Sequence, residues 1–343
     1  MATLDGPLNQ PPEDPTTRSN IIRGFWPSHR RENYQRMDWN PYFRYYARQC
    51  HNSLIDQGQH LLARTHQHVL DIVRHLEIDT PRVSIKQTIL ARIPVRNRPN
   101  EEGLLDNTID LSARLYLMLN IAIEDPNTHV TRQTQLKWTS GTLKESVHDH
   151  FCKPQILGNE DIILHRTFNA ASLERIAGIR IQPTNNLLDH LRILDAEDKL
   201  VAIFHHASFL TQQQSKIYPD GLVEETLRTL SLLFPQNDKE TRKWLQGHCE
   251  FDRIDQMVRR CDPLALDSRQ IEKFRYWHDR IVMLKQAFDE SRPSTVSQWW
   301  HDRRNGVQWY TFWVAILILC LTIFFGLVQS IEGALQVYKA FQP

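Results

Sequence analysis

The chain has 343 residues, of which 41% are hydrophobic and 24% are charged. This length and composition suffice for a buried core, in two domains and a membrane anchor, and they exclude a chain that is disordered throughout. The net charge of +1 is unevenly distributed: residues 1–100 carry 14 Lys and Arg against 9 Asp and Glu, and residues 101–343 carry 27 against 31. The basic residues are dispersed, which favours a solvated surface over a patch for an anionic membrane leaflet.

The cysteines exclude a disulfide framework of the kind found in small secreted domains. They are odd in number, widely spaced and without a Cys-x-x-Cys pair, and one of them lies inside a long apolar segment. This pattern is typical of reduced thiols in the cytosol. The five positions are Cys50, Cys152, Cys249, Cys261 and Cys320.

Residues 1–30 contain five prolines and few large apolar side chains, which predicts a disordered N-terminal segment. The opening residues, MATLDGPLNQPPEDP, include no apolar run, so we expect no signal peptide. Residues 31–140 predict a helical cytosolic region. Within it, apolar residues over 51–78 recur mostly at helical spacing, and residues 104–125 predict a strongly apolar buried helix that ends before Pro126.

Residues 141–220 predict a winged-helix-like α+β unit. Two helices, over 142–151 and 169–178, are followed by IRIQPT, whose alternation predicts a half-buried strand. After a short helix opened by Asn, the segments RIL and LVAIF predict a β-hairpin whose second strand is apolar on both faces.

A winged helix suggests nucleic-acid binding, which the charge of this unit disfavours. Residues 141–220 carry 8 Lys and Arg against 10 Asp and Glu. Because duplex binding draws much of its affinity from neutralising phosphates, a net negative unit is poorly suited to it. We expect a protein-interaction or packing unit and no nucleic-acid partner.

Residues 221–293 predict a helical stalk region that ends near Pro293, which has no N–H to donate. Apolar residues at spacings of 3 and 4 form a seam of about two heptads, which is too short to establish a coiled coil. Packing of this seam onto the protein's own core is the preferred interpretation. The seam consists of Phe274, Trp277, Ile281, Leu284 and Phe288.

Residues 294–330 predict a helix that approaches and crosses a membrane, followed by a short tail at 331–343. No Asp, Glu, Lys or Arg lies between Arg304 and Glu332, and residues 310–328 include twelve Leu, Ile, Val and Phe. These side chains favour insertion by roughly 4 to 7 kcal/mol in total. About twenty helical residues cross a hydrocarbon core about 30 Å thick. The alternative, a buried core helix without a polar face, is unusual at this length.

The flanks of the apolar run predict its orientation, because aromatic rings favour the headgroup zone and positive residues favour the cytosolic side. Only Lys339 follows the run, and the chain has no Asn-x-Ser/Thr sequon. We therefore expect a tail-anchored, single-pass membrane protein with a cytosolic N-terminal domain. The expected membrane-interface anchors are Trp299, Trp300, Arg303, Arg304, Trp309, Tyr310 and Trp313.

The apolar run also contains small residues four apart, which share one helix face and let two helices approach closely. This stripe predicts self-association within the membrane, and so a homo-oligomer. Chance spacing in a segment with some small residues explains the pattern equally well. The stripe consists of Thr322, Gly326, Ser330 and Ala334.

Residues that could carry chemistry are few. The segment HDHFC (148–152) suggests a metal site, but residues two apart on a helix point to different faces. An enzyme site around His190, His205 and His206 would require these side chains to converge with carboxylates. The chain has no G-x-S-x-G, P-loop, G-x-G-x-x-G or H-E-x-x-H motif. We expect no enzymatic activity, no cofactor and no metal.

Several segments resemble a known family. They are EETLRTLSLLFP (224–235), YWHDRIVMLKQAFDE (276–290), QWWHDRRNGVQWYTFWVAILILCLTIFFGLVQSIEGALQVYKAFQP (298–343), FNAASLERIAGIRIQPTNNLLDHLRI (168–193) and VAIFHHASFL (201–210). They are similar to a family of uncharacterised single-span membrane proteins from filamentous fungi, over most of the chain after about residue 104. The resemblance implies a membrane protein and supplies no activity.

A looser similarity is to the CorA-type divalent-cation channels, in which a soluble domain leads through a long helix into the membrane. Members of that family have two spans joined by a Gly-Met-Asn loop, whereas this chain has one predicted span and no such tripeptide. The similarity implies an ion-channel subunit. A pore needs a polar ring, for which only Thr311 and Thr322 qualify between Tyr310 and Val328.

The sequence as a whole predicts a mainly α fold with a small β-hairpin, winged-helix-like unit and one C-terminal transmembrane helix. The first functional hypothesis is a membrane-anchored, cytosol-facing interaction or scaffold protein, with lipid and an unidentified protein or a second copy as partners. The alternative is an oligomeric channel or transporter subunit.

Overall fold

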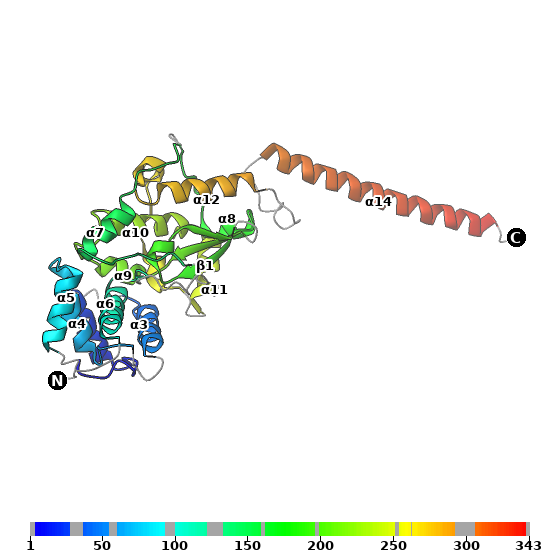
Figure 1. The fold of residues 1–343 in the computed structure, drawn as a ribbon. Helices are drawn as coiled ribbons and strands as arrows, with labels where there is room; N and C mark the ends of the chain where they lie inside the picture. Colours follow the sequence, from blue (N-terminus) through cyan, green and yellow to red (C-terminus); the bar gives the residue numbers. More distant parts are fainter. Residues whose placement is uncertain are drawn as a thin grey trace.

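The computed structural model describes residues 4–27, 37–54, 60–92, 100–121, 133–158, 162–195, 199–250, 254–261, 263–291 and 306–340. The chain is mostly helical, at 61%, with one three-stranded sheet and a long apolar helix at its C-terminal end. The predicted class, mainly α with a small β unit and one long apolar helix at the C-terminal end, is confirmed. Figure 1 shows a globular body from which the last helix extends.

Five helices are described in the N-terminal part of the body. They are α1 (Pro15–Phe25), α3 (Asn40–Ser53), α4 (His66–Glu77), α5 (Arg82–Arg92) and α6 (Glu101–Leu117). The apolar helix α6 is central, because α3, α4 and α5 all pack against it, while α1 packs against α4. The hydroxyl of Tyr42 on α3 donates to the carbonyl oxygen of Leu115 on α6 (2.8 Å), so a buried polar group is satisfied where these helices meet.

The predicted disorder of residues 1–30 does not hold for residues 15–25, which form α1. Asp14 caps this helix by accepting a hydrogen bond from the backbone N–H of Thr17 (2.9 Å), and a proline follows at the first helical position. The prediction failed because average composition does not report how a few apolar side chains are spaced along one face. The buried side chains of α1 are Ile21, Ile22 and Phe25.

The central helix α6 ends earlier than the sequence predicts. The apolar run predicts a helix over 104–125, whereas α6 ends at Leu117 and Met118 takes a left-handed conformation with a φ of 50°. The Met118 N–H still donates to the carbonyl oxygen of Arg114 (2.9 Å), which satisfies one group at the helix end. Hydrophobicity indicates burial but not this end, because no glycine or proline marks the turn. Residues 122–132 lie outside the described residues.

The sheet consists of β1 (Arg180–Thr184), β2 (Arg192–Asp195) and β3 (Leu200–Phe204), in the order β1–β3–β2. Strands β2 and β3 pair antiparallel, which confirms the predicted hairpin, and β3 is buried at the centre. Strand β1 pairs with β3 in parallel, which the sequence analysis does not predict. The short helix predicted between β1 and β2 is a 3-10 turn, η2 (Leu187–Asp189), capped by the side chain of Asn186.

Helices cover the sheet in the C-terminal part of the body (Figure 1). They are α7 (Leu143–Phe151), α8 (Ala170–Arg175), α9 (Ala207–Gln212), α10 (Leu222–Leu233), α11 (Lys239–Glu250) and α12 (His278–Glu290), with 3-10 turns η3 (Gln256–Arg260), η4 (Leu266–Arg269) and η5 (Ile271–Lys273). The predicted helix over 142–151 is confirmed as α7, whose start is fixed by reciprocal capping between Thr142 and Glu145. Helix α8 packs against α11 and β1, and α9 against α10.

One continuous hydrophobic core runs through the body. It includes buried side chains from Leu8 to Phe288, so the regions predicted at 31–140, 141–220 and 221–293 share it. The five seam residues are all buried in this core, which agrees with packing onto the protein's own body. The helix that contains most of the seam, α12, begins only at His278.

Arg82 joins α5 to α6 inside the body. Its side chain is charged and yet only 1% exposed. Its guanidinium group donates to the carboxylates of Asp106 (2.9 Å) and Asp110 (2.7 Å). It also lies over the indole of Trp138, with Cζ 4.7 Å from the ring centroid. Burial raises the pKa of Asp110, and the charge and hydrogen bond of Arg82 oppose that rise. The charge of Arg82 therefore offsets part of the cost of burying the Asp110 carboxylate, and the loss of Arg82 would leave that carboxylate as an unpaired buried charge.

We expect Arg82→Met to lower the free energy of unfolding by about 3 to 5 kcal/mol, because it leaves the buried carboxylate of Asp110 without its ion-pair partner, whereas Asp106 keeps Lys86 (2.8 Å). The matched control is Arg74→Met, since Arg74 pairs with Asp71 (2.9 Å) at an exposed site. That pair should contribute less than about 1 kcal/mol. Urea unfolding of the full-length protein in detergent, followed by circular dichroism, measures both. Equal losses in the two variants would contradict the role given to Arg82.

Candidate functional site

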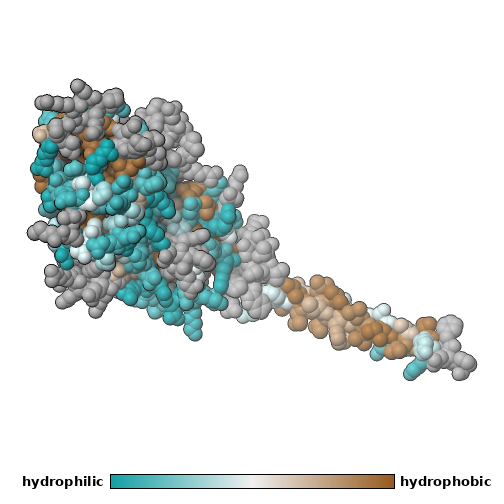
Figure 2. All heavy atoms as spheres, turned by 90° about the horizontal axis from the view of Figure 1, so that it is seen from below, coloured by the Kyte–Doolittle hydropathy of each residue, from teal (hydrophilic) through white to brown (hydrophobic). Residues whose placement is uncertain are grey.

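The last helix, α14 (Gly306–Ala340), is continuous over 35 residues. Its segment Trp309–Ala340 is long and apolar enough to cross a membrane, and none of the most apolar stretch is buried inside the rest of the protein. Figure 2 shows apolar residues gathered along this helix, whereas hydrophilic residues dominate the visible face of the body. Among the described residues, α14 is the one helix with this property.

The helix α14 is longer than the predicted span, which ended at 330 and left 331–343 as a tail. Residues up to Ala340 continue the helix, with Leu335 and Val337 exposed on it and the charged residues Glu332 and Lys339 among them. Gly333 does not interrupt it, because one glycine costs a helix only about 1 kcal/mol. At a rise of about 1.5 Å per residue, the 32-residue segment is about 48 Å long and exceeds a single hydrocarbon core.

The four stripe residues all lie on α14, where a spacing of four advances about 40° around the helix, so they share one face. A side chain placed at Gly326 would meet no other atom within 4 Å. The hydroxyl of Thr322 donates to the carbonyl oxygen of Ile318 (2.8 Å), within the same helix. The stripe is thus a smooth, open surface. That Thr322, Gly326, Ser330 and Ala334 bind a second copy stays a prediction.

The predicted interface anchors are described only in part. Trp309, Tyr310 and Trp313 lie in the first turns of α14, with ring centroids 5.1 Å apart for Trp309 and Tyr310 and 6.2 Å apart for Trp309 and Trp313. This aromatic cluster is the arrangement expected at a membrane–water interface. The remaining anchors, Trp299, Trp300, Arg303 and Arg304, lie outside the described residues.

The histidines considered for chemistry do not meet at one point. His190 lies with Nε2 2.6 Å from the hydroxyl of Thr229, and its ring packs against Trp277 with centroids 4.8 Å apart. His205 and His206 stack on each other, with ring centroids 4.1 Å apart. All three are buried, and burial lowers the pKa of each, for His205 to about 3. They are neutral groups whose described contacts stabilise the core.

A carboxylate that the sequence analysis did not single out lies beside His205. Asp255 accepts hydrogen bonds from the backbone N–H (2.6 Å) and hydroxyl (3.0 Å) of Ser208 and from the Met257 N–H (2.8 Å). Its own N–H donates to Nδ1 of His205 (3.2 Å). Burial raises the pKa of Asp255 to about 7. Asp255, His205 and Ser208 are buried and hydrogen-bond to one another. These hydrogen bonds connect the start of α9 to η3. No metal-binding group of three His, Cys, Asp or Glu occurs among the described residues.

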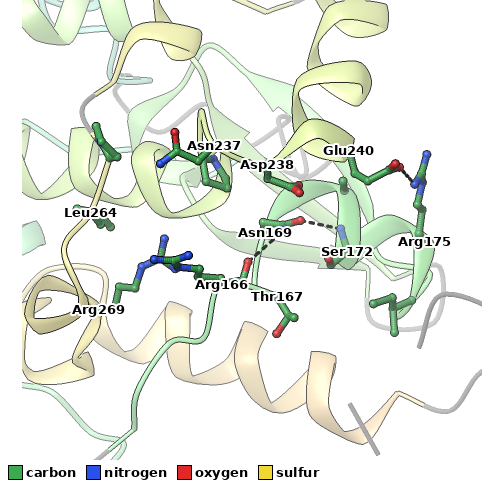
Figure 3. A pocket seen from close by; sticks show the side chains of 14 residues that line it. Arg166, Thr167, Asn169, Ser172, Arg175, Asn237, Asp238, Glu240, Leu264 and Arg269 are labelled. Atoms are coloured by element: carbon green, nitrogen blue, oxygen red, sulfur yellow. Dashed lines mark hydrogen bonds and ion pairs between the residues drawn. The ribbon is translucent and has the colours of Figure 1, made fainter. Parts of the chain in front are cut away.

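The cavity drawn in Figure 3, of about 450 Å³, lies between the loop before α8, the start of α11 and the turn η4. Two distant segments pair beside it. The Leu164 N–H donates to the carbonyl oxygen of Arg269 (2.9 Å), and the Ile271 N–H donates to that of Ile162 (3.0 Å). This pairing brings the guanidinium group of Arg166 next to that of Arg269 (Figure 3). The sequence analysis missed both arginines, because no local motif or periodicity links residues so far apart.

No protein-family model, no curated protein and no solved structure matches this chain. The resemblance to single-span fungal membrane proteins therefore stays a prediction.

We expect acid to destabilise the body, because buried histidines must bind protons when it unfolds. The pKa of His66 is lowered by burial to about 4, and that of His205 to about 3, against about 6.5 in an unfolded chain. Each such histidine lowers the free energy of unfolding as the pH falls from about 6.5 towards its folded pKa, by up to about 1.4 kcal/mol per pH unit. Asp255 acts in the opposite direction over this window, because its pKa is raised. The pKa values of Asp110 and Glu225 are raised as well, but five histidines outnumber these three carboxyls, since the pKa values of His150, His190 and His206 are also lowered.

Urea midpoints of the full-length protein in detergent at pH 7 and pH 5 measure this effect, and the midpoint at pH 5 should be lower. His66→Gln should reduce the difference between the two midpoints by one histidine's share, because glutamine does not titrate. The matched control is His51→Gln, at an exposed position. A midpoint that is unchanged or higher at pH 5 would show that the buried histidines do not govern the response.

Proposed function

We propose that α14 anchors this protein in a membrane and holds the body at the cytosolic face, where the body acts as an interaction or scaffold module. The observation that carries the proposal is the exposed apolar helix: its 32-residue segment has no cover from the body. The body is already closed around one core of its own, so it has no need of α14 for its own stability. Lipid is then the environment that removes this surface from water.

Two observations support the cytosolic orientation. The basic residues that flank the apolar run stand mainly on its N-terminal side. The described Cys50 and Cys152 in the body form no disulfide, as expected in a reducing compartment.

The contacts within α14 favour an anchor over the channel alternative. A pore requires polar groups that face the permeating ion. The hydroxyls of Thr311 and Thr322 instead donate to the carbonyl oxygens of Val307 and Ile318 (2.8 Å each). The proposed role needs no catalytic group, and the histidines considered for one are engaged in the core. The small-residue stripe makes a second copy of this chain the first partner to test.

Membrane insertion is tested by alkaline carbonate extraction of cells that express the full-length protein. The wild type should stay in the membrane pellet until detergent is added. The double variant Leu319→Arg, Leu327→Arg should move to the soluble fraction, because each arginine disfavours insertion by about 2.5 to 3.5 kcal/mol. The control is Val83→Arg, Met283→Arg, which adds the same charges at exposed apolar positions of the body. A wild-type protein in the carbonate supernatant would refute the anchor.

Self-association is tested by amine-reactive crosslinking in native membranes. Gly326→Ile should reduce crosslinked dimers on the order of tenfold, because it places a branched side chain where two backbones would meet. The matched control, Val328→Ile, creates the same residue about 200° around the helix and should leave dimers unchanged. Equal dimer yields in both variants would remove the stripe from the proposal.

A further inference from the structure

The cavity of Figure 3 contains two neighbouring positive charges. The side chain of Arg269 lies at its floor, in a residue that is 5% exposed, while Arg166 is exposed at its mouth. Burial and the nearby Arg166 charge both lower the pKa of Arg269. Two guanidinium groups held together in this way repel each other unless an anion lies between them.

The described residues provide no such anion. Neither Arg166 nor Arg269 makes an ion pair within the described chain, and the Arg269 guanidinium group donates a long hydrogen bond to the Leu164 carbonyl oxygen (3.5 Å). The two carboxylates of the cavity are engaged elsewhere. Glu240 pairs with Arg175, and Asp238 accepts hydrogen bonds from Thr241 (Figure 3 shows the first pair pointing away from the two arginines).

We propose that this cavity binds a phosphate-type oxyanion between Arg166 and Arg269. Planar guanidinium groups bind phosphate oxygens through paired hydrogen bonds, and two of them match the double charge of a phosphate monoester. The amide of Asn237 lies across the cavity and provides a further donor (Figure 3). A volume of about 450 Å³ exceeds that of a bare phosphate ion, so the site has room for the organic group that carries the phosphate.

The position of the cavity is compatible with a phosphate from a membrane lipid or from a soluble compound. Its Arg166 loop continues into Phe168, which packs against Phe288 at the end of α12, with ring centroids 5.7 Å apart. Helix α12 ends at Glu290 and α14 begins at Gly306, so the cavity lies near the part of the body that leads to the membrane helix (Figure 1). The phosphate can belong to a lipid headgroup of the same membrane or to a soluble phosphate monoester.

The experiment measures the apparent melting temperature of the full-length protein by tryptophan fluorescence, because a ligand that binds only the folded state raises it. In the first arm, the protein in detergent is titrated with inorganic phosphate against sodium chloride of equal ionic strength. This arm does not depend on membrane anchoring, so it can fail or succeed separately from the proposed function. In the second arm, nanodiscs of phosphatidylcholine contain an equal fraction of either phosphatidic acid or phosphatidylserine.

Phosphate should stabilise the wild type above the chloride control. Arg166→Gln should weaken this binding on the order of tenfold, because a charge-assisted hydrogen-bonded pair is lost at an exposed site that the fold does not need. Arg269→Lys, which keeps the buried charge but loses the planar fork, should also weaken it. Arg74→Gln, outside the cavity, should leave it unchanged.

The two arms identify the source. A lipid headgroup is the source if phosphatidic acid raises the melting temperature, phosphatidylserine does not, and the effect is lost in Arg166→Gln. Stabilisation by inorganic phosphate without a preference for phosphatidic acid supports a soluble phosphate compound. No stabilisation in either arm, or an equal response of the wild type and Arg166→Gln, overturns the proposal. Melting temperatures measured without ligand show whether each variant is folded.

Discussion

An apolar helix in contact with water is unfavourable by about 25 cal/mol for each Å² that it exposes. Most of α14 is exposed in this way, and large exposed apolar surfaces mark sites where a protein meets lipid or a partner. The body offers no cover, because its own apolar side chains already pack into one core. The cover for α14 must therefore come from outside the body, and a lipid bilayer or another protein chain can provide it.

Hydrogen bonds and aromatic packing hold α12, the last described helix before α14, against the rest of the body. Glu225 on α10 accepts hydrogen bonds from the N–H groups of Arg275, Tyr276 and Trp277 (2.8 Å each), just before α12 begins. Burial raises the pKa of this carboxyl, and the three N–H groups oppose the rise. The other end of α12 is held by the aromatic contact between Phe288 and the loop beside the arginine cavity. Helix α12 is thus held at both ends, where it contacts the core and the loop beside the cavity.

The features that the sequence predicts well are those recorded in neighbouring residues. The hairpin of β2 and β3 follows from two short apolar segments around a polar turn, and α7 follows from the Thr142 and Glu145 capping pattern. The apolar run at the C-terminal end predicts a long apolar helix, and α14 is that helix. In each of these cases the local pattern and the final packing require the same structure.

The features that the sequence does not predict depend on contacts between distant segments or on the backbone conformation of a single residue. The helix α1 is stabilised by packing against α4, which average composition cannot show. The end of α6 depends on the left-handed conformation of Met118, and the parallel pairing of β1 depends on tertiary packing. The arginine cavity exists because the segments around Leu164 and Arg269 pair, and neither segment contains a motif of its own. A candidate binding site such as this cavity is hard to predict from sequence, because residues from distant segments form it.

The length of α14 has a consequence for its last turns. A segment of 32 helical residues is about 48 Å long, whereas a hydrocarbon core is about 30 Å thick. Glu332 and Lys339 lie in the last turns of α14, so its excess length is not a longer apolar stretch. If the apolar part of α14 spans a bilayer, these last turns extend as a helix beyond the hydrocarbon core.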